Sequence, residues 1–340
     1  MTAAADGGRR WAGAGAGAGV WVWVWVWGLM LFLLSGCLAA PPHRLQPQDE
    51  PQPPALQAPV RVALVLSGGG LRGLAHLGVL RVLNAHGLRP DLVVGTSVGA
   101  IIGGAYASGA AIEALEALPL PAELDPWGGL FLSPAQRSAG LERFVAASLA
   151  QHRLQDFALR FVAVATARQS GCVMLFGSGD AARAIVASSA LPGALAPVLI
   201  GATAYVDGGL GAPLPVRVAR ALGAQTVIAV DTTFHAEPVV PDGIVNSVFH
   251  AGMVMARNLA VLDRAAADLV LTPALPPVAE VTLANRQALA QAGATAALQQ
   301  IDRLRALFKE DPRTTSSMRT WPPPPLCRAL DPLNHASISP

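Results

Sequence analysis

Two short apolar runs in this chain are each followed by a glycine-rich turn and then by a segment with helical spacing. The first run, residues 60–66, leads through its turn into a helix predicted over 72–87. The second run, residues 92–94, leads through the turn 95–99 into a helix of small residues. A strand that is followed by a helix and a further strand implies a parallel sheet with helices on its faces. We therefore expect an α/β fold.

The alternation of strands and helices continues to about residue 309. Further strands are expected at 161–166, 203–206, 226–230 and 269–271, and further helices at 181–188, 215–222, 245–267 and 286–308. The apolar runs after residue 60 have the length of strands and are interrupted by Gly, Pro, Arg or Asp. No membrane-spanning helix is therefore predicted in this part of the chain.

Composition narrows the class of protein. Of the 340 residues, 52% are hydrophobic and 14% are charged, whereas soluble domains carry about 25% charged residues. This balance excludes disorder of the whole chain and makes a membrane protein the first class to test. The formal net charge of +2 argues against a nucleic-acid-binding protein, which needs a clustered basic face.

The N-terminal segment accounts for part of the hydrophobicity. Arg9 and Arg10 precede an uncharged stretch over 11–34, and five of the seven tryptophans lie before residue 37. A positive start followed by an apolar core is typical of a signal peptide. The stretch ends in L-S-G-C, with Cys37 last, which resembles the lipobox of bacterial lipoproteins. A signal anchor that stays in the membrane is the alternative.

The lipobox resemblance implies cleavage before Cys37, a lipid on this cysteine, and a place in the bacterial cell envelope. Outer-membrane anchoring, with the protein facing the periplasm, is favoured. The chain then divides into four parts. They are a lipoprotein signal peptide over 1–36, a Pro/Gln-rich tether over 37–59, a folded domain over 60–309 and a disordered Pro-rich tail over 310–340.

Two further cysteines bear on the redox compartment. Cys172 lies in an apolar run and is expected to be a core residue, whereas Cys327 lies in the predicted tail. A disulfide between them is the alternative in an oxidising compartment.

The turn 95–99 reads G-x-S-x-G, with Ser97 between the flanking residues Gly95 and Gly99. Small neighbours let the chain turn sharply and expose the serine hydroxyl at the strand-to-helix junction. The helix N-terminus beneath it favours developing negative charge. Ser97 is therefore a candidate nucleophile, although glycine and serine also open helices that carry no chemistry.

The first turn reads S-G-G-G-L-R-G over residues 67–73. Consecutive glycines let backbone N–H groups point at an anion. One candidate anion is a nucleotide phosphate, because Gly68, Gly70 and Gly73 satisfy G-x-G-x-x-G. The other is the oxyanion of an acyl-transfer intermediate. Asp91, the acid that could hold a ribose, precedes its strand and is expected at the opposite edge of the sheet, which favours the oxyanion.

A third pattern, Asp207-Gly208-Gly209, follows the apolar strand predicted over 203–206. Alone it is ordinary turn chemistry. Beside a serine nucleophile, Asp207 becomes a candidate base, because a partly buried carboxylate has a raised pKa and can deprotonate serine directly.

These three motifs occur in the order seen in patatin-like phospholipases, which this chain resembles over about residues 60–231. The glycine loop 68–70 with Arg72, the turn with Ser97, and the turn at Asp207 carry the resemblance, together with the segment 187–193. The resemblance implies a three-layer α/β/α fold with a mainly parallel central sheet. Each motif alone is weak, and the three together are specific.

The resemblance also implies a mechanism, which is hydrolysis of carboxylic esters of lipids by a Ser-Asp dyad without histidine. Ser97 would attack the acyl carbonyl, and Asp207 would take its proton and return it to the leaving alcohol. Backbone N–H groups of Gly68, Gly69 and Gly70 would bind the oxyanion. The substrate would be a phospholipid or lysophospholipid, with no metal and no cofactor, while protein partners stay unknown.

Other interpretations remain open at this stage. His235 and His250 follow Asp207, so the order also suits a Ser-His-Asp triad, whereas His76 is expected to be structural. A nucleotide-binding protein or a catalytically silent membrane-tethered scaffold is the alternative function. The apolar stretch 127–132 is either local core packing or a lid or membrane-contact loop.

Overall fold

The computed structural model describes residues 49–54, 59–117, 132–233, 244–276, 282–309 and 324–327. The predicted signal peptide, Cys37, His235 and residues 127–131 of the apolar stretch lie outside these ranges. The helices within them are too short or too polar to cross a bilayer.

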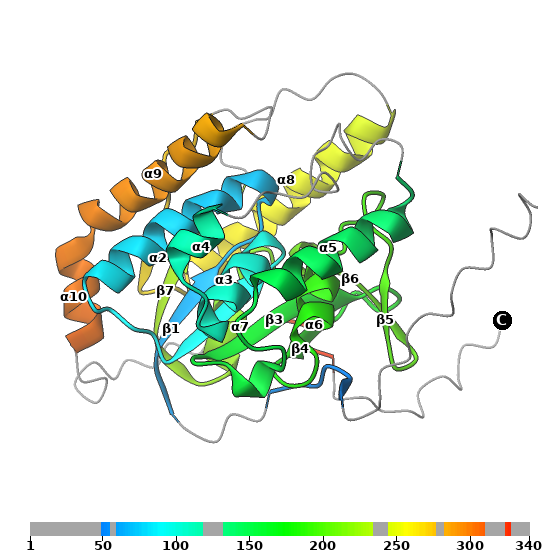
Figure 1. Cartoon of the computed structure of the whole chain (residues 1–340), viewed down its shortest axis with the longest axis horizontal. Helices are drawn as coiled ribbons and strands as arrows, with labels where there is room; N and C mark the ends of the chain where they lie inside the picture. The colour runs from blue at the N-terminus through cyan, green and yellow to red at the C-terminus, as the bar shows by residue number, and fades with distance from the viewer. Residues whose placement is uncertain are drawn as a thin grey trace, which may run out of the picture. The chain divides into compact units, whose positions relative to one another are not determined.

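The described strands form one mixed, mainly parallel sheet (Figure 1). Its order is β5-β6-β3-β2-β1-β7-β8, and β4 pairs with β3. The neighbours from β3 through β2, β1 and β7 to β8 run parallel, whereas β4 and β6 run antiparallel to β3. The strands are β1 (Val60–Leu66), β2 (Leu92–Thr96), β3 (Arg160–Ala167), β4 (Val173–Phe176), β5 (Val198–Ile200), β6 (Thr203–Asp207), β7 (Ala224–Val230) and β8 (Leu269–Leu271).

Helices cover both faces of this sheet. The α-helices are α2 (Ala75–Ala85), α3 (Val98–Ser108), α4 (Ile112–Ala117), α5 (Pro134–Ser148), α6 (Ala181–Ser189), α7 (Val216–Ala221), α8 (Ile244–Arg264), α9 (Leu283–Gln299) and α10 (Ile301–Lys309). The 3-10 turns are η2 (Gly70–Leu74), η4 (Leu154–Asp156) and η5 (Gly208–Leu210). The predicted three-layer α/β/α class is therefore confirmed.

Alternation along β1 shows how the two apolar cores form. Leu64 and Leu66 point into the core that contains α2, α3, α6 and α9, whereas Ala63 and Val65 point into the core that contains α7 and part of α8. All four side chains are fully buried. A strand that is buried on both faces reads as a continuous apolar run, as residues 60–66 do.

Three sequence-based element predictions need correction. The helix expected over 286–308 is two helices, because Gln300 leaves the helical conformation between α9 and α10. Strands β4 and β5 have only four and three residues, too few for a periodic signal to stand out. Helix α5 lies where the apolar periodicity is weak, but its start is marked by Ser133 and Gln136, which cap it reciprocally, with Pro134 at its first turn.

The ends of the folded domain also differ from the prediction. Residues 49–54, expected in the tether, pack on the domain: the Gln52 amide donates to the Ser178 carbonyl at 3.0 Å, and the Arg153 guanidinium pairs with the Asp49 carboxylate at 3.0 Å. Strand pairing and backbone hydrogen bonds can therefore begin well before the apolar pattern does.

The predicted tail is likewise ordered in part. The backbone of residues 325–327 pairs with Val173 at the start of β4, through Val173 N–H to the Pro325 carbonyl at 2.8 Å and Cys327 N–H to the Val173 carbonyl at 2.8 Å. Cys172 and Cys327 form a disulfide. The expectation that Cys172 is simply a core residue was wrong, because β4 brings a half-buried thiol beside the returning chain.

Helices α2 and α9 lie side by side in Figure 1, and two glycines allow their close contact. A Cβ atom on Gly78 of α2 would lie 1.7 Å from the Ala290 carbonyl oxygen, and one on Gly293 of α9 would lie 1.9 Å from the Ala75 carbonyl oxygen. Neither helix can therefore carry a side chain at this crossing.

We expect Gly78→Ala to lower the free energy of unfolding by about 2 kcal/mol or more, because the added methyl forces α2 and α9 apart. The matched control is Gly252→Ala in α8, where a Cβ atom meets nothing within 4 Å. There the higher helix propensity of alanine should raise the stability by up to about 1 kcal/mol. Urea unfolding followed by circular dichroism measures both values. Equal effects would contradict the proposed packing.

Candidate active site

Ser97 occupies a strained turn between β2 and α3. Its φ is 56° and its ψ is −125°, and it is the one non-glycine residue with positive φ in the part of the chain that the structure describes. Such a conformation costs about 1–3 kcal/mol and persists only where the surrounding fold imposes it. The predicted sharp turn at the G-x-S-x-G motif is therefore present, with Ser97 at its apex.

The two glycines of the motif are required by backbone contacts. A Cβ atom on Gly95 would lie 2.4 Å from the Gly99 carbonyl oxygen, and one on Gly99 would lie 2.3 Å from the Leu66 carbonyl oxygen. Helix α3 thus starts directly against the carboxyl end of β1. This contact brings Ser97 next to the glycine loop, so that a Cβ atom on Gly68 would lie 3.4 Å from the Ser97 Cβ.

Asp207 meets Ser97 from the other side. The Ser97 hydroxyl donates to Asp207 Oδ2 at 2.7 Å, and the Gly209 amide donates to Asp207 Oδ1 at 2.7 Å. Asp207 ends β6, and a Cβ atom on the following Gly208 would lie 2.0 Å from the Val164 carbonyl oxygen of β3. The three residues of the Asp-Gly-Gly turn therefore hold the carboxylate against the serine.

Burial sets the charge state of Asp207, whose exposed fraction is 5%. Desolvation raises its pKa from 3.8 to about 6, against the opposing effect of the hydrogen bonds from Gly209 and Ser97. At neutral pH the group is thus an anion that gains a proton readily. A carboxylate with these properties can accept the serine proton without a histidine.

The glycine loop has the expected conformation but a smaller set of donors. Gly69 and Gly70 have φ values of 153° and 58°, which favour glycine. The Gly68 amide, however, donates to the Pro213 carbonyl at 2.9 Å, so it is not free to bind an oxyanion. The prediction of three donors is corrected to two candidate amides, those of Gly69 and Gly70.

Arg72 and Gly73 support the loop. A Cβ atom on Gly73 would lie 2.2 Å from the Val98 side chain, so this glycine allows η2 to pack on the start of α3. Burial lowers the pKa of Arg72 to about 10, and the nearby Asp231 carboxylate opposes that shift. Arg72 therefore remains a cation at neutral pH.

The motifs did not identify Ser188 as a site residue. Its hydroxyl accepts a hydrogen bond from the Ser97 amide at 3.0 Å and donates to the Val164 carbonyl at 2.6 Å. The Asp207 amide donates to the Ala190 carbonyl at 3.0 Å. The Ala-Ser segment at the end of α6 thus holds both residues of the pair, and its composition was the only signal available in the sequence.

The histidine that the structure describes beside the loop is structural, as predicted. His76 is fully buried, its Nε2 bonds the Ser67 carbonyl at 2.9 Å, and burial lowers its pKa to about 4. His235 lies outside the described residues, and His250 lies in α8 in a stretch whose side chains are not described. The contact between Ser97 and Asp207 is direct and leaves no place for an imidazole between them.

Asp91 does not lie where a nucleotide-binding site would need an acidic residue. Asp91 Oδ2 accepts the Val62 amide at 2.8 Å, which places this carboxylate near the amino end of β1, away from the glycine loop. The position where a ribose-binding acid would stand is taken by the Ser97 turn. Among the described residues no cluster of His, Cys, Asp or Glu suits a metal ion.

The chain is similar to known proteins over part of its length. Residues 64–220 match the family model described as patatin-like phospholipase. The chain is 33% identical to the lysophospholipase NTE1 of Debaryomyces hansenii over 50% of this chain and 12% of that protein. It is 30% identical to an uncharacterised NTE family protein of Mycobacterium tuberculosis over 74% of this chain and 42% of that protein. The chain thus spans less than half the length of these relatives.

We expect Asp207→Asn to stabilise the fold at neutral pH. The wild-type carboxyl has a higher pKa in the folded state than in the unfolded state, so wild-type stability falls as pH rises from about 4 to about 6. The fall amounts to up to about 3 kcal/mol. Asparagine carries no charge, so the variant does not lose this stability as the pH rises. Urea unfolding at pH 4 and pH 7 measures the difference.

The matched control is Asp231→Asn. Asp231 is equally buried but pairs with Arg264, so its loss at pH 7 should destabilise the fold by about 3–5 kcal/mol. A destabilised Asp207→Asn variant at pH 7 would show that the Asp207 carboxylate is well solvated or paired, contrary to its burial.

Proposed function

Because residues 64–220 belong to the patatin-like phospholipase family, we propose that this chain is a lipid acyl hydrolase in which Ser97 is the nucleophile and Asp207 the general base. The observation that carries the proposal is the 2.7 Å hydrogen bond from the Ser97 hydroxyl to a buried, readily protonated carboxylate. Two relatives with the name lysophospholipase support a phospholipid or lysophospholipid as substrate.

The reaction proceeds in two halves. Ser97 Oγ attacks the ester carbonyl carbon while its proton passes to Asp207, and the carbonyl oxygen becomes an oxyanion. The glycine loop lies beside Ser97 at Gly68, and the amides of Gly69 and Gly70, which follow it, donate to that oxyanion. The partial positive charge at the start of α3 favours the oxyanion further. Asp207 then protonates the leaving alcohol, and the acyl group remains on Ser97. Water, deprotonated by the same carboxylate, releases the fatty acid.

The strained turn contributes to this chemistry. Ser97 turns out of β2 with positive φ, its side chain is half-buried, and its amide is held by Ser188. Because the surrounding backbone imposes this geometry, the nucleophile needs little reorganisation when the substrate arrives.

A second part of the proposal concerns location. We propose that the chain is a lipoprotein of a bacterial cell envelope, cleaved before Cys37 and lipidated there, which would hold the domain beside its lipid substrate. The L-S-G-C sequence that ends at Cys37 supports this. The disulfide between Cys172 and Cys327 also supports it, because structural disulfides belong to oxidising compartments.

A fluorophosphonate probe should label Ser97, and Ser97→Ala should abolish both labelling and hydrolysis of a lysophospholipid. Asp207→Asn should lower kcat/KM by at least about 10³-fold. Since Asp207 must be ionised to act, wild-type kcat/KM should rise with pH to a plateau, with an apparent pKa of about 6. Fatty acid release at controlled pH measures these quantities.

His235→Ala and His250→Ala are the controls, and both should keep wild-type turnover. Loss of turnover in a folded histidine variant would refute the dyad in favour of a triad. A wild-type chain that neither reacts with the probe nor releases fatty acid would be a silent scaffold.

For the location, metabolic labelling with palmitate should mark the wild-type chain in the membrane fraction, and Cys37→Ser should lose the label and leave the membrane. Cys327→Ser is the matched control, because it should keep the lipid. A thiol count on the unreduced wild type should find Cys172 and Cys327 blocked. Free thiols at both positions would contradict an oxidising compartment.

A further inference from the structure

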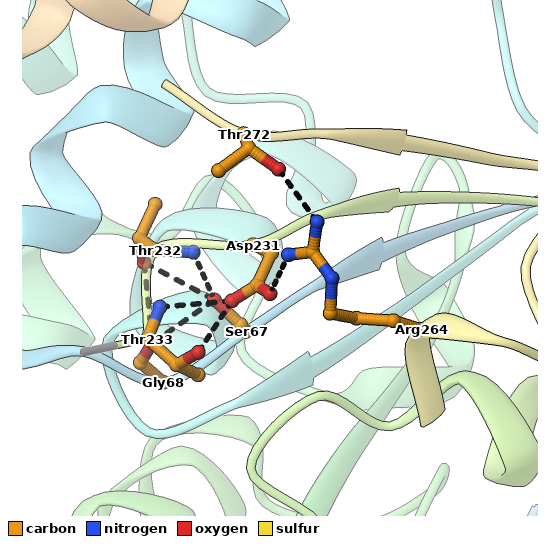
Figure 2. Close-up of polar contacts among 7 residues, drawn as sticks. All are labelled: Ser67, Gly68, Asp231, Thr232, Thr233, Arg264 and Thr272. Carbon is orange, nitrogen blue, oxygen red and sulfur yellow. Dashed lines mark hydrogen bonds and ion pairs between the residues drawn. The ribbon is translucent and has the colours of Figure 1, made fainter. Parts of the chain in front are cut away.

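A buried polar cluster that takes no part in the proton transfer contacts the start of the glycine loop at Gly68 (Figure 2). We call it the loop anchor and define it as Ser67, Asp231, Thr232, Thr233 and Arg264. Ser67 follows β1, residues 231–233 follow β7, and Arg264 ends α8. Ser67, Asp231 and Thr232 are fully buried, so their polar groups depend on one another for hydrogen bonds.

Thr232 contacts the loop through three groups. Its hydroxyl donates to the Gly68 carbonyl at 3.1 Å, and its amide donates to Ser67 Oγ at 2.8 Å. Its carbonyl oxygen would lie 2.5 Å from a Cβ atom on Gly69, so the backbone of Gly69 rests on it. The residue thus fixes the position of the loop immediately before the two candidate oxyanion donors.

Asp231 fixes Thr232 in turn. Its Oδ1 accepts the Thr233 amide at 3.0 Å and the Thr233 hydroxyl at 2.6 Å, and its Oδ2 accepts the Arg264 guanidinium. The Asp231 amide donates to the Leu271 carbonyl of β8 at 2.9 Å.

Arg264 extends the anchor outward. Its other terminal nitrogen donates to the Thr272 hydroxyl at 3.1 Å, as Figure 2 shows. A buried carboxylate is costly unless it is paired, so this ion pair holds the turn after β7 in one conformation.

We propose that Thr232 is a positioning residue for catalysis, and that it holds the Gly69 and Gly70 amides where they can meet the oxyanion, with the Asp231–Arg264 pair fixing Thr232 from behind. This inference rests on the proposed function. Three consecutive glycines have more conformational freedom than any other tripeptide, so the loop alone would not keep its donors aligned. Oxyanion donors act only within about 2.7–3.1 Å of the developing charge.

The anchor contacts the loop through groups other than those that hold the dyad. Ser97 and Asp207 are held by Ser188, Gly209 and their own hydrogen bond, and none of these groups touches Thr232. Loss of the Thr232 hydroxyl should therefore disturb the oxyanion donors and leave the nucleophile and base in place. This separation makes the proposal testable.

The test compares Thr232→Val, which removes the hydroxyl, with Thr232→Ser, which keeps it. The substrates are 4-nitrophenyl butanoate and the analogue in which sulfur replaces the carbonyl oxygen. Backbone amides bond an oxyanion better than a thiolate-like sulfur. The ratio of kcat/KM on the oxygen ester to kcat/KM on the sulfur analogue therefore reports on the oxyanion donors. We expect Thr232→Val to lower kcat on the oxygen ester by about 10–100-fold with KM within about threefold, and to lower the ratio by about tenfold.

Thr232→Ser should restore both values to near the wild type. Thr166→Val is the matched control: Thr166 is also a buried threonine, its hydroxyl has no hydrogen-bond partner among the described groups, and its loss should leave the ratio unchanged. If Thr232→Val does not fold, Thr232→Ala, which adds no bulk, carries the same expectation. Thermal melting establishes that each variant is folded.

An unchanged oxygen-to-sulfur ratio in a folded Thr232→Val or Thr232→Ala variant would overturn the inference, even if turnover falls, because the residue would then be structural only. A wild-type chain that hydrolyses neither ester would instead refute the proposed function, together with the inference that rests on it. The two failures are therefore distinguishable.

Discussion

The contact between the backbone of the β1 end and the start of α3 determines the rest of the site. A Cβ atom on Gly99 would lie 2.3 Å from the Leu66 carbonyl oxygen, and one on Gly95 would lie 2.4 Å from the Gly99 carbonyl oxygen. With no side chain at either position, β2 can turn into α3 within a single residue. Ser97 is that residue, which explains both its positive φ and its place beside the glycine loop.

Two buried carboxylates near this contact illustrate how environment sets a role. Asp231 pairs with the Arg264 guanidinium and accepts two hydrogen bonds from Thr233, so its charge is compensated and it serves as an anchor. Asp207 accepts hydrogen bonds from a neutral hydroxyl and a neutral amide, and burial raises its pKa to about 6. The same side chain is thus structural where a cation meets it and reactive where desolvation dominates.

Much of the fold was predictable because the strands of a parallel sheet are buried on both faces and read as apolar runs. Strands β1 and β8 have the predicted bounds, and β2, β3, β6 and β7 extend by only one or two residues beyond them. The short antiparallel strands β4 and β5 were missed. The break at Gln300 was missed since no Gly or Pro marks it.

The site shows the same division. Ser97, Asp207 and the glycines were found because each needs a particular residue type at a particular turn. Ser188, Thr232 and the hydrogen bond that occupies the Gly68 amide were not found, because hydrogen bonds between segments 91 to 165 residues apart leave no local pattern. The disulfide between Cys172 and Cys327 was predicted only as the alternative, since it depends on β4 meeting a short returning segment.

The sequence by itself determined the alternation of strands and helices, the order of the three motifs and the residues able to serve as nucleophile and base. These follow from local chemistry: apolar periodicity, glycine at tight turns, and the reactivity of a hydroxyl or a carboxylate. Only the tertiary structure decided that Ser97 Oγ lies 2.7 Å from Asp207 Oδ2 and that the Gly68 amide donates to the Pro213 carbonyl. It also decided that Thr232 contacts the glycine loop. The physical reason is that burial and hydrogen bonding between distant segments, which set distances and pKa values, arise only when the sheet brings β1, β2, β6 and β7 together.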